Sequence, residues 1–227
     1  MAFDINVGSG STVTDEGLRS FFSDVFLRMA FALGLSGTMA FIGSTIPALY
    51  SGGLLTWLVI LSPLAFVLIM SFGAERLSTN ALILCFVGFA VAQGLSMGSL
   101  LLLYTATSVV TAFLIAAATF GSFAVIGYTT KKDLTSMGTF LLVGLIGIII
   151  AGIVNIFLQL PALAATINVL AVLIFIGLTA YDVQRLKETY YAGGDSAPVR
   201  TLGALSLYLN FINIFINLLQ LIGERKE

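Results

Sequence analysis

The residue with the clearest chemical potential is a carboxylate inside one of the most apolar stretches of the chain. Asp182 is the one acidic residue well inside an apolar run, in the segment LTAYDVQRLK. If that run spans a membrane, the carboxylate is a candidate functional group, because an ionisable side chain in lipid is costly and rarely occurs without a role. Asp182 also lies close to Arg185, so a second interpretation is an interface residue that caps the end of its helix.

The last apolar stretch, residues 202–222, carries a row of amides at helical spacing. Its members are Asn210, Asn213, Asn217 and Gln220. They follow one another at i, i+3, i+7 and i+10 and therefore share one face of a helix, which Ser206 extends by one turn. Amides that face lipid would be costly, so this face must meet protein or a water-filled path.

The two stretches are close in sequence, and their polar groups are expected to meet. A loop centred near 193–194 separates them, with Asp182 about ten residues before it and Asn210 about sixteen after it. Antiparallel packing would bring both to a similar depth, and Arg76, at the end of the second apolar run, is long enough to reach inward. A carboxylate with amide and backbone oxygens suits a hard cation such as Ca²⁺, and also suits protons.

The composition is that of a polytopic membrane protein. The 227 residues are 59% hydrophobic and 9% charged, with a mean hydropathy of +1.07, whereas a soluble domain carries about 25% charged residues. A net charge of −1 without a basic run gives no indication of nucleic acid binding. The single cysteine excludes an intrachain disulfide, and the absence of histidine and of hydrolase or nucleotide-binding motifs predicts no catalytic residues and no cofactor.

Seven apolar runs are long enough to cross a bilayer as helices, which takes about 20 residues. They lie near 27–49, 54–73, 80–103, 106–128, 138–160, 163–186 and 202–222. We therefore expect an all-α membrane protein with a seven-helix domain at 27–222, an N-terminal segment at 1–26 and a short tail at 223–227. Residues 15–28 are amphipathic and form either a helix lying on the membrane or the lead-in to the first span.

The charges predict how the chain is oriented. Eight basic residues flank the runs on one side: Arg19, Arg28, Arg76, Lys131, Lys132, Arg185, Lys187 and Arg200. The short connections on the other side carry no charge. The positive-inside rule then places the N-terminus and the basic loops in the cytoplasm. The tail cations Arg225 and Lys226 face outward if the last stretch spans fully, which its 21 residues favour over a re-entrant path.

Other spans carry isolated small or polar residues. Gly94 and Gly98 form a GxxxG pair, which we expect to serve packing within the chain rather than a dimer. Single amides occur at Gln93, Asn155, Gln159 and Asn168. We interpret each as an interhelical hydrogen bond rather than as a pathway residue.

Four segments together resemble the Bax inhibitor-1 family in its bacterial branch. They are TAYDVQRLK, GALSLYLNFINIFINLLQL, NIFLQLP and KKDL, and the resemblance extends over all seven spans. It implies a bacterial inner-membrane protein whose last helix is central and wrapped by the other six. It also implies a pH-sensitive Ca²⁺ leak, in which two aspartates on the sixth and last helices share a proton and an arginine after the second helix latches the closed state. Asp182 matches the first aspartate, and Arg76 is the best match for the latch.

The second aspartate is replaced in this chain. The family motif would read LYLDFIN, and here it reads LYLNFIN, with Asn210. Two adjacent carboxylates share one proton because both cannot ionise at close range, whereas an amide does not titrate. We therefore predict that pH gating is shifted to lower pH or lost, that an Asp182–Asn210 hydrogen bond keeps the helices in register, and that Ca²⁺ affinity falls.

Two functions of different classes follow from these observations. The first is a Ca²⁺ leak or pH-responsive ion homeostasis protein, with Asp182 as gate and pH sensor, Asn210 as its partner and Arg76 as its latch. In it Asn213 and Asn217 line the path, Asp182 and Asn210 are the candidate Ca²⁺ ligands, and the partners are the lipid bilayer, Ca²⁺ and protons. The alternative is a regulator without ion flux that binds a membrane protease or another stress-response membrane protein.

Overall fold

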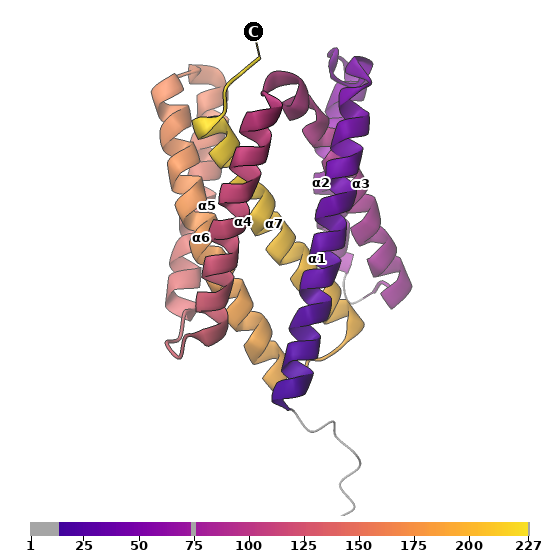
Figure 1. Ribbon diagram of the computed structural model, residues 1–227, viewed down its shortest axis with the longest axis vertical. Helices are drawn as coiled ribbons and strands as arrows, with labels where there is room; N and C mark the ends of the chain where they lie inside the picture. Colours follow the sequence, from indigo (N-terminus) through magenta and orange to yellow (C-terminus); the bar gives the residue numbers. More distant parts are fainter. Residues whose placement is uncertain (1–13, 74–75, 227) are drawn as a thin grey trace, which may run out of the picture.

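The computed structural model describes residues 14–73 and 76–226, and this part of the chain is a bundle of seven α-helices (Figure 1). The elements are α1 (Asp15–Ser44), the 3₁₀ helix η1 (Pro47–Tyr50), α2 (Leu54–Gly73), α3 (Thr79–Leu103), α4 (Ala106–Thr129), α5 (Thr135–Leu158), α6 (Pro161–Tyr191) and α7 (Ala197–Ile222). All seven α-helices are long and apolar enough to cross a membrane. The predicted all-α fold with seven spans is confirmed.

Helix boundaries follow from local chemistry. Ser78, Thr105 and Ser196 precede α3, α4 and α7, and each side chain accepts a hydrogen bond from a backbone amide in the first turn. Such caps satisfy amides that have no partner within the helix. Pro161 begins α6, where its fixed φ angle fits the first turn and its missing N–H costs nothing.

The amphipathic segment at 15–28 is part of α1, which runs without a break from Asp15 to Ser44. Leu18, Phe21, Phe22 and Val25 are all buried in the bundle. The alternative in which this segment lies separately on the membrane surface is therefore wrong, because its apolar face packs against other helices. The helix passes through residue 26, where we had expected a boundary between the N-terminal segment and the first span.

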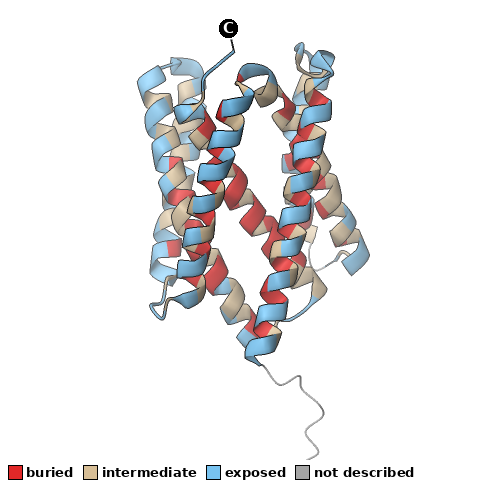
Figure 2. Cartoon of the chain, viewed as in Figure 1, coloured by how far each residue is buried: buried red, intermediate tan, exposed pale blue. Residues whose placement is uncertain are grey.

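Helix α7 crosses the middle of the bundle (Figures 1 and 2). In its most apolar window 61% of the residues are buried, compared with none in the corresponding window of α5. It packs against α6, α4, α1 and α3. Helices α2 and α5 form an outer layer, since α2 packs mainly on α3 and α5 on α6. The central position predicted for the last helix is confirmed, with direct packing to four of the other six helices.

A small-residue contact joins α1 to α3, and one polar contact connects both helices to α7. Gly94 on α3 meets the backbone of Ser36 on α1, so the GxxxG pair packs within the chain as expected. The buried Ser36 hydroxyl donates to the carbonyl oxygen of Ala90 on α3, at 2.7 Å, and lies 2.7 Å from the Tyr208 hydroxyl on α7. This contact joins three helices.

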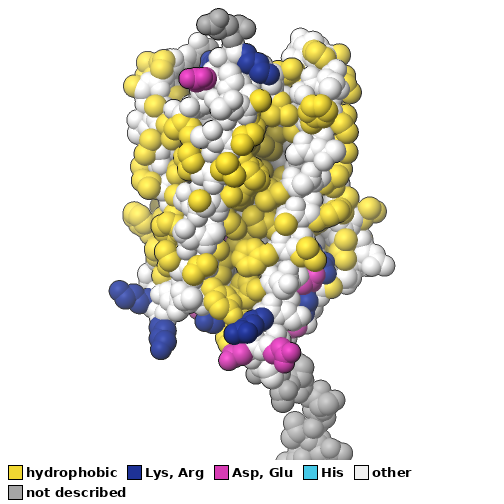
Figure 3. All heavy atoms as spheres, in the orientation of Figure 1, with side chains coloured by type: hydrophobic (Ala, Val, Ile, Leu, Met, Phe, Trp, Pro, Cys, Tyr) yellow, Lys and Arg dark blue, Asp and Glu magenta, His cyan; other side chains and the backbone are white. Residues whose placement is uncertain are grey.

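The two ends of the bundle differ in charge. Figure 3 shows an apolar band around the middle, with most of the lysine and arginine side chains gathered at the end where α1 begins. We call this the basic end. The tail after α7 lies at the opposite end, where the amide of Thr105 donates to the carbonyl oxygen of Glu224, at 3.0 Å, and the amide of Lys226 to that of Leu103, at 2.9 Å. Helix α7 therefore runs the full length of the bundle.

Candidate functional site

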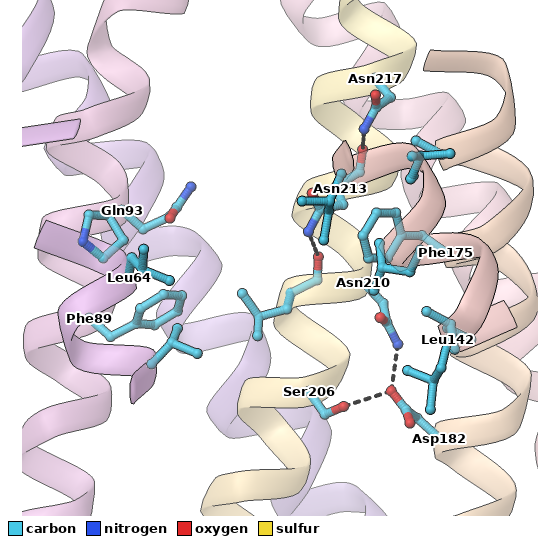
Figure 4. Close-up of a pocket in the computed structure, with 18 of the residues that line it drawn as sticks. Leu64, Phe89, Gln93, Leu142, Phe175, Asp182, Ser206, Asn210, Asn213 and Asn217 are labelled. Atoms are coloured by element: carbon cyan, nitrogen blue, oxygen red, sulfur yellow. Dashed lines mark hydrogen bonds between the residues drawn. The ribbon is translucent and has the colours of Figure 1, made fainter. Parts of the chain in front are cut away.

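The centre of the site is a contact between α6 and α7. The hydroxyl of Ser206 donates to Oδ2 of Asp182 at 2.6 Å, and the side-chain amide of Asn210 donates to the same oxygen at 2.7 Å (Figure 4). Asn210 is buried, and Asp182 is half-buried. The predicted hydrogen bond between Asp182 and Asn210 is present, and Ser206 adds a second donor to the same carboxylate oxygen.

The hairpin of α6 and α7 brings these side chains together. A short loop at 192–196 connects the helices, and Gly193 adopts a φ angle of +82°, which is unfavourable for other residues. Ser206 and Asn210 are four residues apart and lie on the same face of α7, so both can approach one carboxylate on the antiparallel helix. Asp182 and Asn210 therefore lie at a similar depth in the bundle, as the sequence predicts.

The remaining amides of α7 have a different arrangement. The side-chain amide group of Asn213 donates to the carbonyl oxygen of Leu209, and that of Asn217 to the carbonyl oxygen of Asn213, each at 2.8 Å. Both side chains also line a cavity. One N–H of each amide bonds within α7, so the carbonyl oxygen and the second N–H of each remain for the cavity. Gln220 is exposed and lines a separate pocket near the opposite end.

Two cavities meet at Asp182. The larger, of about 790 Å³, is bounded by α2, α3, α5, α6 and α7 and contains Asp182, Asn210, Asn213 and Asn217 in its lining. The smaller, of about 240 Å³, lies between α6 and α7 and extends toward the basic end as far as Thr189. Asp182 and Ser206 line both cavities. Their hydrogen bond therefore lies at the boundary between a space within the bundle and a space toward its basic end.

The two arginines near the site differ in position. Arg185 is three residues after Asp182 on α6 and lines both cavities. Arg76 is exposed just after α2, and within residues 14–73 and 76–226 no ion pair joins it to Asp182. In this arrangement the cation beside the carboxylate is Arg185, and the latch role of Arg76 stays a prediction.

The sequence did not predict that Gln93 lines the cavity. Its expected interhelical hydrogen bond is absent among the residues that the structure describes, and its side chain instead lines the larger cavity across from Asn213 (Figure 4). Asn155 also differs from expectation, because its side-chain oxygen accepts the amide of Leu160 at the end of α5, at 3.0 Å. A single amide on a helix carries no periodic signal, so its partner or cavity becomes visible only when the helices are assembled.

The site has few charged ligands for a metal ion. Within the described ranges, no group of three or more histidine, cysteine, aspartate or glutamate side chains is placed to hold one. Asn210 directs its N–H toward Asp182 here, so the two do not present a joint set of oxygens. To bind a cation together they would have to separate, and Asn210 would have to present its carbonyl oxygen.

A seven-helix bundle around a central polar helix, with a carboxylate contact within it, defines a multi-pass membrane protein with an intramembrane polar site. Residues 18–227 match the family described as "Inhibitor of apoptosis-promoting Bax1". The chain belongs to this family, the Bax inhibitor-1 family, as its sequence motifs indicate.

Bacterial relatives match over nearly the full length. The chain is 44% identical to an uncharacterized protein of Caulobacter vibrioides, covering 94% of this chain and 92% of that protein. It is 36% identical to an uncharacterized protein of Rickettsia prowazekii, covering 94% and 93%. It is 34% identical to the inner membrane protein YbhL of Escherichia coli, covering 92% and 94%. The name of YbhL agrees with a membrane protein, and none of the three names states an activity.

Proposed function

We propose that the protein is a cation leak path across the bacterial inner membrane, with Ca²⁺ as its first candidate ion, and that the contact of Asp182 with Asn210 and Ser206 is its gate. The observation that supports this proposal is the position of the contact between two cavities. Asp182, Ser206 and Arg185 line both cavities, so a movement of these side chains would join the two spaces.

In this proposal the hydrogen bonds of Asp182 keep the gate closed. One carboxylate oxygen accepts two donors from α7, which ties α6 and α7 together at this depth. A cation that approaches Asp182 competes with those donors for the carboxylate oxygens, since hard cations bind oxygen ligands. Opening requires that Asn210 and Ser206 release Asp182, and the released carboxylate then faces the permeating ion.

Protons act on this gate through one carboxylate. An aspartate pair would share a proton and titrate as a coupled unit, but Asn210 does not titrate. We therefore expect the flux to depend weakly on pH near neutrality, or to change only at lower pH. Arg76 remains the proposed latch, acting in a state in which it approaches Asp182. If Arg76→Gln leaves the flux unchanged, that part of the proposal is wrong.

The test is Ca²⁺ flux into liposomes that contain the purified protein, measured across about pH 5–8. We expect the wild type to carry Ca²⁺ flux. In Asp182→Ala the flux should no longer change with pH, and in Asn210→Asp the flux should change with a pH midpoint nearer neutrality. An identical midpoint near neutral pH for wild type and Asn210→Asp would contradict the role of Asn210. Absence of flux at every pH, with a membrane protease that co-purifies from native membranes, would favour the non-transporting regulator instead.

A further inference from the structure

The larger cavity has a second polar wall that faces α7. Gln93 and Ser96 line it from α3, while Asn213 and Asn217 line it from α7. Figure 4 shows Gln93 and Asn213 on opposite sides of the open space, each pointing toward it. The cavity of about 790 Å³ therefore has polar groups from two helices in its lining.

These polar groups are short of partners. The Gln93 side chain makes no hydrogen bond to any other residue that the structure describes, and the Asn213 and Asn217 amide groups bond to carbonyl oxygens of their own helix. Asn213 and Asn217 each keep a carbonyl oxygen and one N–H, and Gln93 keeps its whole amide, without a partner among the residues that the structure describes.

The apolar rim of the cavity indicates what can occupy its interior. The rim of the cavity toward α2 and α5 is apolar, with Leu64 54% exposed, Leu142 46% exposed and Ile149 53% exposed. Such side chains are compatible with lipid, whereas unpaired amides are not, because hydrocarbon offers them no hydrogen bonds. The interior of the cavity must therefore hold water or an ion, even where its rim meets lipid chains.

We propose that Gln93, Asn213 and Asn217 form a hydrated transit site for a metal cation, distinct from the gate at Asp182. The site is built of neutral oxygen ligands, which replace part of a hydration shell without the strong attraction of a carboxylate. A site of this kind binds a cation weakly enough to release it, which a conducting path requires. This assignment rests on the proposed cation leak and makes Gln93 the residue of α3 that contributes to it.

Hydration is tested without any ion flux. In a Cys85→Ser background, Gln93→Cys is compared with Ile146→Cys, which places a cysteine on the 59% exposed, lipid-facing side of α5 outside the cavity. A small charged methanethiosulfonate reagent, present on both sides of the vesicle, reacts with thiolates that water reaches. We expect Gln93→Cys to react about tenfold faster or more. Ser96→Cys is the second variant if Gln93→Cys does not fold. Equal or slower reaction at the cavity positions would overturn the proposal.

Cation transit is tested by flux. We expect Gln93→Leu to reduce Ca²⁺ flux, and Gln93→Glu to lower the Ca²⁺ concentration for half-maximal flux by about tenfold, because a carboxylate adds charge to the ligand set. The matched control is Asn168→Leu, which removes an amide of α6 that lines a different pocket. If wild type carries no flux, the leak itself fails. If wild type conducts and both Gln93 variants behave like it, the transit site fails.

Discussion

At the scale of the residue, the behaviour of the site depends on how one carboxylate is satisfied. Oδ2 of Asp182 accepts both Ser206 and Asn210, and these two donors come from one face of α7. Asn210 is a hydrogen-bond donor that does not titrate, at a position where the resemblance to the family implies an aspartate. The contact in this chain is therefore held by hydrogen bonds to a carboxylate rather than by a shared proton.

The first prediction concerns Ser206→Ala, which removes one of the two donors. A hydrogen bond to a charged group contributes about 1.5–3 kcal/mol, and about 1.4 kcal/mol shifts an equilibrium tenfold. We expect the closed state to weaken and basal Ca²⁺ flux in liposomes to rise about tenfold. Ser99→Ala is the control, since Ser99 bonds only to a carbonyl oxygen of its own helix. Unchanged basal flux in Ser206→Ala would argue against the gate.

The second prediction concerns Asn210→Leu, which keeps the volume of the side chain roughly and removes its donor. Asp182 would lose its buried partner, and α6 and α7 would lose a contact that sets their register. We expect thermal unfolding in detergent to begin at lower temperature, by an amount that corresponds to about 1–3 kcal/mol. Asn210→Asp should retain a contact only while one of the two carboxyls is protonated, so its stability should fall as pH rises, and a pH-independent stability would contradict this account.

At the scale of the element, close helix contacts set the geometry that the site needs. Gly127 on α4 lies against the backbone of Ala180 on α6, two residues before Asp182. Near the basic end, Asp24 on α1 pairs with Arg28 at 3.0 Å and with Arg200 of α7 at 3.2 Å. Helix α6 is thus held from the α4 side and α7 from the α1 side, and the carboxylate contact forms between them.

The third prediction follows from this packing. Gly127→Leu introduces a side chain where the backbone of α6 already lies, so α4 and α6 must separate. Overpacking of this kind costs about 1–3 kcal/mol, and we expect a lower unfolding temperature and faster Ca²⁺ leak. The control is Gly147→Leu on α5, where an added Cβ meets nothing within 4 Å. Equal stability of the two variants would contradict the role of the contact.

At the scale of the whole molecule, the fold separates two groups of three helices by the central α7. Helices α1, α2 and α3 pack together on one side, and α4, α5 and α6 on the other. The larger cavity lies between the groups and has lining residues from both. A relative movement of the two groups would change this cavity while leaving each group intact, which is the type of motion that a gate between them requires.

The fourth prediction concerns orientation. The basic loops and the tail lie at opposite ends of the bundle, and the positive-inside rule places the basic end in the cytoplasm. In a Cys85→Ser background, an impermeant maleimide added outside intact spheroplasts should label Lys226→Cys and leave Lys131→Cys unlabelled until the membrane is opened. Labelling of both positions from the same side would show that the last helix does not span in the membrane.

Much of the architecture could be predicted from the sequence because hydropathy and periodicity are local properties. Seven apolar runs predicted seven helices, and the amides on one face of the last run predicted that this face is internal, while the family resemblance implied its central place. The pairing of Asp182 with Asn210 also followed, since a short loop restricts two adjacent helices to antiparallel packing. Ser206 was recognised as part of the stripe, but its bond to Asp182 was not foreseen.

The sequence by itself determined the membrane-spanning helices, the internal face of α7 and an amide that does not titrate at position 210, because each depends on residue type and spacing along one chain. Only the tertiary structure decided that Gln93 faces the same cavity as Asn213, that no ion pair joins Arg76 to Asp182 within the described residues, and that Asp182 lines two cavities. Those relations join helices far apart in sequence, and they depend on how whole helices rotate and pack against one another.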